Sequence, residues 1–128
     1  MNEKVKYWLE ISDYDLITAE AMLKSKRYLY VGFMCHQAIE KILKALYSGL
    51  KNEVPPYTHN LIYLAEKIGI YEKLSSEHKI FIDTIDPMNI EARYPSYKKD
   101  LLKILTEEKC IELLNKTKEF HNWIKKKL

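Results

Sequence analysis

Apolar residues recur at intervals of three and four along most of the chain, and no useful length of it alternates apolar with polar residues. This spacing predicts amphipathic α-helices, whereas a period of two would predict strands. Only three glycines interrupt the 128 residues. We therefore predict an all-α protein, folded as an up-and-down bundle of four to five helices.

Capping residues and prolines set the expected helix boundaries. Pro55-Pro56 end the second helix, since paired prolines cannot continue one. Thr58, Ser75 or Ser76, and Thr106 are expected N-caps, and Gly69 is an expected C-terminal stop. The predicted helices span about 3–26, 29–50, 58–68, 75–85 and 106–127, with an irregular segment over 88–101 and a further helical turn within 98–105.

The second predicted helix contains FMCHQAIEKILKALY, Phe33–Tyr47, whose apolar arc covers more than half of the circumference. A helix of this kind lies at the centre of a bundle. Its polar residues keep to one narrow sector, but His36 and Glu40 lie outside that sector, one turn apart. A carboxylate in an apolar face needs a partner or a function. Either the His36–Glu40 pair ties helix ends or loops together, or it belongs to a polar site in a cleft. The polar sector consists of Gln37, Lys41, Lys44 and Ser48.

A second carboxylate, Asp15, lies in the middle of the apolar stripe of the first helix. Two acids inside the apolar faces of two helices predict a shared cationic partner. Arg93 is the expected partner, because it is one of only two arginines and lies in a long segment between Pro87 and Pro95. We expect it over a cleft between the first two helices.

Arg93 has two compatible roles, as a structural clasp for its segment or as a ligand contact. A guanidinium can grip a phosphate or a carboxylate in two places. Tyr94 and Tyr97 flank it with rings on which a base could stack. By contrast, His59 directly follows the expected cap Thr58, which favours a helix-start role for this histidine over a ligand role.

The composition and the residue spacing argue against several other classes of function. The net charge of +3 is small, and residues of both signs are dispersed along the chain. This pattern lacks the strong basic patch that is typical of a nucleic-acid-binding protein. No His, Cys or acid pair has metal-ligand spacing, so we expect no metal and no cofactor. No apolar run is long enough to span a membrane. The charged N-terminus and two isolated cysteines favour a cytoplasmic protein.

Four segments, in order along the chain, resemble HEPN domains, the "higher eukaryotes and prokaryotes nucleotide-binding" helical domains. They are Asp15, His36–Lys41 followed by Lys44-Ala45, Thr58–Leu61, and Ala92–Pro95. The resemblance covers nearly the whole chain, 1–128, as a single domain of the stand-alone prokaryotic type. It implies a helical bundle that often forms homodimers and that often works with a small nucleotidyltransferase, in some cases as a toxin–antitoxin pair.

Many HEPN domains are metal-independent ribonucleases that use an arginine followed, after four to six residues, by a histidine. The corresponding window after Arg93 holds Lys98, Lys99 and Asp100, so this motif is absent. Cleavage of RNA would need a histidine brought in by folding, such as His36 or His59. The chain is therefore expected to lack strong ribonuclease activity.

Three functions remain open at this point. The chain is a nucleotide-binding module (for ATP or GTP) that partners a nucleotidyltransferase, a degenerate ribonuclease or toxin acting on RNA through Arg93 and a distant histidine, or a purely structural interaction bundle. A homodimer is expected, with Tyr7 and Tyr14 as outer contacts. The residues expected to bind the nucleotide or to organise its site are Asp15, His36, Glu40, Lys44, His59, Arg93, Tyr94 and Tyr97.

Overall fold

The computed structural model describes residues 1–90 and 95–128. These residues form α-helices joined by loops and short 3-10 helices, with no strand among them, which confirms the predicted all-helical bundle. The helices are α1 (Glu3–Lys24), α2 (Tyr28–Lys51), α3 (Leu61–Ile68), α4 (Ser76–Ile85), α5 (Pro95–Ile104) and α6 (Glu107–Lys125), with the 3-10 helices η1 (Tyr71–Lys73) and η2 (Asp86–Met88).

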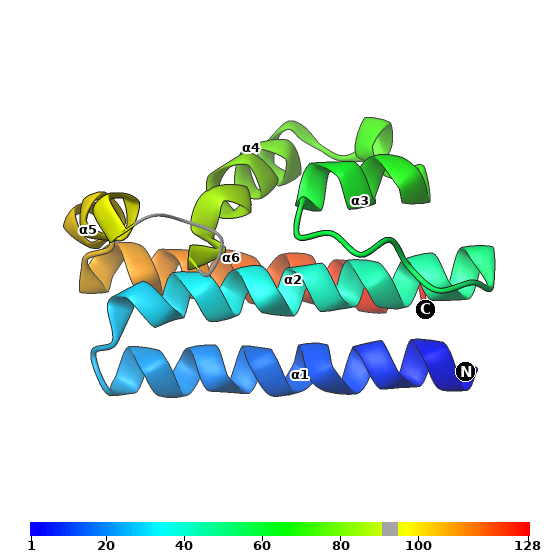
Figure 1. Ribbon diagram of the computed structural model, residues 1–128, viewed down its shortest axis with the longest axis horizontal. Coiled ribbons are helices and arrows are strands. Elements are labelled where there is room, and N and C mark those ends of the chain that lie inside the picture. Colours follow the sequence, from blue (N-terminus) through cyan, green and yellow to red (C-terminus); the bar gives the residue numbers. More distant parts are fainter. Residues whose placement is uncertain (91–94) are drawn as a thin grey trace.

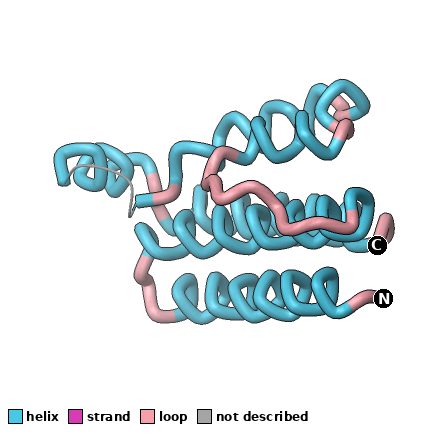
Figure 2. The backbone as a smooth tube through the Cα atoms, turned by 45° about the vertical axis from the view of Figure 1, so that its right-hand side comes forward, coloured by secondary structure: helices cyan, strands magenta, loops and turns pink. Residues whose placement is uncertain are grey.

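Helix α2 is the centre of the bundle, as its wide apolar arc predicts. It packs against α1 along their length and against α6, and it also contacts α3, α4, α5 and η2. Figure 1 shows α1 and α2 running in opposite directions, with α3 and α4 on the opposite side of α2 from α1. The tube view in Figure 2 shows the same layers and places both chain termini at one end of the molecule.

The polar sector of α2 does not face solvent. Ser48 is fully buried, Lys44 is 5% exposed, and Gln37 and Lys41 are half-buried. The helices α1 and α2 approach closely at two small residues. There the buried Ser12 hydroxyl donates a hydrogen bond of 2.6 Å to the Ala38 carbonyl oxygen. The interface between these two helices therefore contains polar and charged groups that need partners.

The predicted caps are mostly found, with one correction. Thr106 and Ser75 accept hydrogen bonds from backbone N–H groups in the first turns of α6 and α4, and Gly69 ends α3 with φ +86°. The prediction of Thr58 as the cap of α3 is wrong. Asn60 caps that helix, because its side chain accepts from the Tyr63 N–H at 2.9 Å, while the Thr58 hydroxyl accepts from the Asn60 N–H.

The segment predicted to be irregular is helical over more of its length than expected. Helix α5 begins at Pro95, well before the single turn predicted within 98–105. Proline is well suited to the first position of a helix, because its missing N–H has no partner there in any helix. The prolines of this segment thus include a helix start, whereas the sequence pattern indicates only a loop.

Candidate functional site

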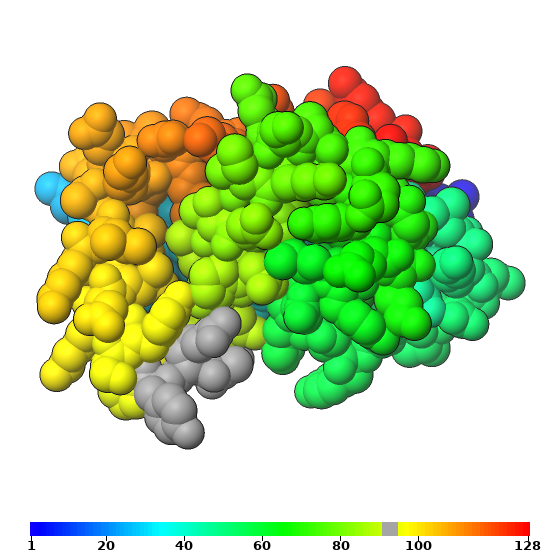
Figure 3. Space-filling model, turned by 90° about the horizontal axis from the view of Figure 1, so that it is seen from above, coloured from blue at the N-terminus to red at the C-terminus, as the bar shows by residue number. Residues whose placement is uncertain are grey.

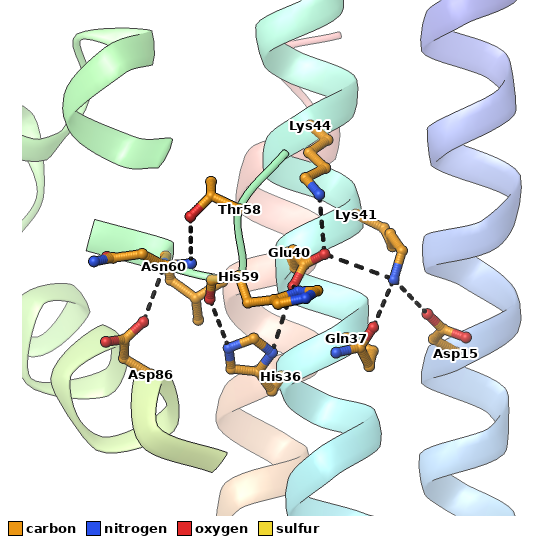
Figure 4. Close-up of polar contacts among 11 residues, drawn as sticks. Asp15, His36, Gln37, Glu40, Lys41, Lys44, Thr58, His59, Asn60 and Asp86 are labelled. Atoms are coloured by element: carbon orange, nitrogen blue, oxygen red, sulfur yellow. Dashed lines mark hydrogen bonds and ion pairs between the residues drawn. The ribbon is translucent and has the colours of Figure 1, made fainter. Parts of the chain in front are cut away.

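Glu40 lies at the centre of a group of polar side chains that joins α1, α2 and the loop before α3 (Figure 4). It is 1% exposed. Its Oε1 accepts a hydrogen bond from His59 Nδ1 at 2.9 Å, and its Oε2 accepts one from Lys44 Nζ at 3.1 Å. Burial on its own would raise the pKa of Glu40, but the His59 hydrogen bond and the nearby lysine charges together hold that pKa below its usual value. The buried carboxylate is therefore ionised at neutral pH.

Lys44 is a buried cation fixed between Glu40 and α1. Its ammonium lies 5.3 Å from the centre of the Trp8 ring, in a cation–π contact, besides its bond to Glu40. A charge buried this far needs such partners. Lys44 is 5% exposed, and its described partners are Glu40 and Trp8.

Lys41 is the cation that the two carboxylates share within the described residues. Its ammonium lies 3.8 Å from Asp15 Oδ2 and 3.9 Å from Glu40 Oε2, and it donates to Gln37 Oε1 at 2.7 Å. Burial, and then the Glu40 charge, raise the pKa of Asp15, against the lowering effect of Lys41. A shared cation was predicted, but Lys41 was not the residue proposed for it, because it was assigned to the polar sector.

His36 is fully buried and acts as a neutral hydrogen-bond donor. Burial lowers its pKa to about 4, so at neutral pH the ring carries one proton. Its Nε2 lies 3.1 Å from the His59 carbonyl oxygen, which can only accept, so the proton is on Nε2. Its Nδ1 lies 3.9 Å from Glu40 Oε1 without a proton between them. His36 therefore holds the backbone of the loop at His59 and does not form an ion pair.

His59 is the member of the group that solvent reaches. Its side chain is 51% exposed, and the bond from Nδ1 to the ionised Glu40 fixes the orientation of the ring. Its Nε2 makes no hydrogen bond within the described residues. Tyr57, 98% exposed, places its ring centre 6.3 Å from that of His59. The expected helix-start role of His59 belongs instead to Asn60, and Tyr57 is a neighbour that the sequence pattern did not indicate.

The remaining candidates lie apart or cannot be placed. Arg93 and Tyr94 lie outside the described residues. Tyr97 is half-buried on α5, which packs near the start of α2 (Figure 1). His78, another histidine, is half-buried on α4, where its ring centre lies 4.6 Å from that of Trp123 and 5.1 Å from that of Phe120.

Residues 1–90 and 95–128 contain neither a candidate metal site nor a candidate membrane-spanning helix. No group of three or more His, Cys, Asp or Glu side chains there could hold a metal ion. None of the helices in that part of the chain combines the length and the apolar character needed to cross a membrane.

Cys35 and Cys110 are both buried, and burial raises their thiol pKa values to about 12 and about 11.

A search of curated proteins found no significant match. The crystal structure of TT1696 from Thermus thermophilus superposes with a TM-score of 0.83, at 20% identity, over 99% of this chain and 100% of that one, which shows a shared fold. The family model of the HEPN domain matches residues 5–128. This match covers almost the whole sequence, and the chain therefore belongs to the HEPN domain family.

Proposed function

We propose that this chain is a nucleotide-binding HEPN module, and that the nucleotide binds beside His59. The observation that carries the proposal is the ionised, buried Glu40, which orients a half-exposed imidazole next to an exposed tyrosine ring. A fixed polar group beside an aromatic surface is what a nucleotide needs, because phosphate and base require different chemistry.

Two kinds of contact would hold the nucleotide at this site. A phosphate oxygen would bind at His59 Nε2, with Lys41, whose side chain is 17% exposed, as a further cation of the group. The base would stack on Tyr57, whose ring is almost wholly in solvent. Lys44, Asp15 and His36 would hold these groups in place and would not touch the ligand.

Calorimetric titration with ATP and GTP tests the proposal. His59→Ala should weaken binding roughly tenfold to a hundredfold, the loss expected for one charge-assisted contact of about 1.5–3 kcal/mol. Tyr57→Ala should also weaken it, whereas Tyr14→Ala, which removes another exposed ring from α1, should not. An unchanged affinity in both His59→Ala and Tyr57→Ala, with thermal melts showing folded protein, would refute this site.

Arg93 remains a separate proposal from the sequence. We expect it to contact the phosphate, so Arg93→Ala should lower nucleotide affinity, and Arg93→Lys should restore it only in part, because an ammonium cannot make the bidentate contact. If Arg93→Ala lowers the melting temperature and leaves affinity unchanged, the residue is a structural clasp.

We also propose that the chain works beside a small nucleotidyltransferase, within a toxin–antitoxin pair. The support is the family to which the chain belongs and its lack of the arginine–histidine ribonuclease motif. A neighbouring gene for such a transferase, with a product that co-elutes with this chain, is the expected finding. A transferase that elutes separately at micromolar concentrations would argue against the pair.

One observation favours a second function, metal-independent cleavage of RNA. In the Glu40–His59 pair a carboxylate orients an imidazole through Nδ1, which is how a general base is held in many hydrolytic enzymes. Cleavage of single-stranded RNA in EDTA that is lost in His59→Ala would support this function. Intact RNA after prolonged incubation with the unaltered protein would exclude it.

A further inference from the structure

The neutral His59 ring is held in one of its two tautomers. Because Glu40 is ionised and can only accept, the 2.9 Å hydrogen bond between Glu40 Oε1 and His59 Nδ1 places the ring proton on Nδ1. The second ring nitrogen, Nε2, therefore keeps its lone pair, and it makes no hydrogen bond within the described residues. Such a nitrogen is a nucleophile whose direction is set by the protein.

Among the four histidines of the chain, His59 is the one that a molecule in solution reaches most easily. Its side chain is 51% exposed, whereas His36 is fully buried, His121 is 4% exposed and His78 is half-buried. Figure 3 shows the face of the molecule on which α3 and α4, in green, lie at the surface beside the chain that leads into α3. A reagent that modifies imidazoles would therefore meet His59 first.

The charges around His59 suit an anionic electrophile. When Nε2 forms a bond while Nδ1 keeps its proton, the ring becomes positively charged. The Glu40 carboxylate, 1% exposed and hydrogen-bonded to Nδ1, stabilises that charge with little screening by water. Lys44 and Lys41, whose ammonium groups lie 3.1 Å and 3.9 Å from Glu40 Oε2, add positive charge to the same group. An anionic phosphoryl group is therefore attracted to this site more than a neutral electrophile is.

We propose that His59 Nε2 accepts a phosphoryl group from a donor of the phosphoramidate class, and that Glu40 positions the ring for the transfer. The Nε2 lone pair forms a bond to phosphorus while the phosphorus–nitrogen bond of the donor breaks, and the protonated amine of the donor leaves as a neutral amine. No proton moves, because Nδ1 keeps its own, and the positive charge passes to the ring, where Glu40 offsets it. This modification shares His59 with the proposed nucleotide site but needs no nucleotide.

Incubation of the full chain with phosphoramidate, followed by mass spectrometry at neutral pH, tests the proposal. Leu102→His supplies a matched reference, because Leu102 is 50% exposed and no acid lies three or four residues from it along the chain. In this variant His59 should be phosphorylated roughly tenfold faster, or more, than the introduced histidine. The difference should disappear in urea, where the fold is lost. Equal rates in the folded variant would overturn the proposal.

NMR of the nitrogen-labelled protein separates the effect of Glu40 from that of exposure. The neutral His59 ring should carry its proton on Nδ1, and coupling to phosphorus should place the new bond on Nε2 after the reaction. A proton on Nε2, or a phosphoryl group on Nδ1, would overturn the proposal whatever the rates are.

Glu40→Gln removes the negative charge but keeps an acceptor for Nδ1. It should slow phosphorylation of His59 roughly tenfold or more, towards the rate of the reference histidine. An unchanged rate in folded Glu40→Gln would contradict the role of the carboxylate. If this variant does not fold, the tautomer and the position of the phosphorus bond in the unaltered protein decide the question.

Discussion

Among single residues, Glu40 has the largest expected effect on stability, because three nitrogen-bearing side chains converge on a carboxylate that is 1% exposed. Glu40→Ala would leave Lys44 buried without its counter-charge. We expect the free energy of unfolding to fall by about 3–5 kcal/mol, the usual effect of breaking a buried pair from one side. Urea denaturation measures it.

Asp100→Ala is the control, because Asp100 pairs with Lys103 at 3.8 Å on a solvated surface. It should change the free energy of unfolding by less than about 1 kcal/mol. If the two variants lose similar stability, Glu40 is not the organising group described above.

His36 makes stability depend on pH in a window set by its pKa. Burial lowers that pKa from 6.5 to about 4, so between these values the unfolded chain binds a proton that the folded chain does not. Stability should therefore be fully present above about pH 6.5 and fall by roughly 3 kcal/mol as the pH drops to about 4. The lowered pKa of His121 acts in the same direction.

His36→Gln isolates this contribution, because the amide can still donate to the His59 carbonyl oxygen but does not titrate. Its urea midpoints, measured between pH 4 and pH 7, should vary less with pH than those of the unaltered protein. The same slope in both proteins would show that His36 is not the group responsible.

Part of the site could be read from the sequence at this scale. Asp15 and Glu40 are carboxylates inside apolar helical faces, and that conflict with burial marks them without a structure. The role of Lys41 could not be read, because its sector on α2 is polar and therefore looks solvated until α1 is seen to cover it. Tyr57 was missed because a loop residue has no periodicity to reveal its neighbours.

Among the elements, α3 ends at a glycine that is required by its backbone conformation and not by packing. Gly69 has φ +86°, and a Cβ built there would have no atom within 4 Å, so space is not the constraint. Gly69→Ala should therefore cost about 1–2 kcal/mol through backbone strain alone. Gly69→Asn should cost less, because asparagine tolerates this conformation. Equal melting temperatures for the Ala variant and the unaltered protein would contradict this.

Helix ends were predicted well where a side chain caps the backbone and less well elsewhere. Ser75, Gly69 and Thr106 each satisfy backbone groups that local sequence identifies. At α3 two capping residues, Thr58 and Asn60, stand two positions apart, and their order of preference could not be settled locally. The choice between these two caps depends on which part of the molecule packs against the start of α3, and the local sequence does not show this.

At the scale of the whole molecule, the apolar arc of α2 predicted its central place in the bundle. The homodimer remains a prediction. Tyr7 and Tyr14 are 57% and 74% exposed, which the predicted contact through α1 requires.

The central claim is that a nucleotide binds beside His59, and its most direct test is an NMR titration of isotopically labelled protein with ATP. The account predicts that the largest shift changes fall on Tyr57, Thr58 and His59, with smaller ones at Lys41. It also predicts that α6 stays unperturbed and that His59→Ala removes the response. Shift changes confined to α4 and α6, or none at millimolar ATP, would contradict it.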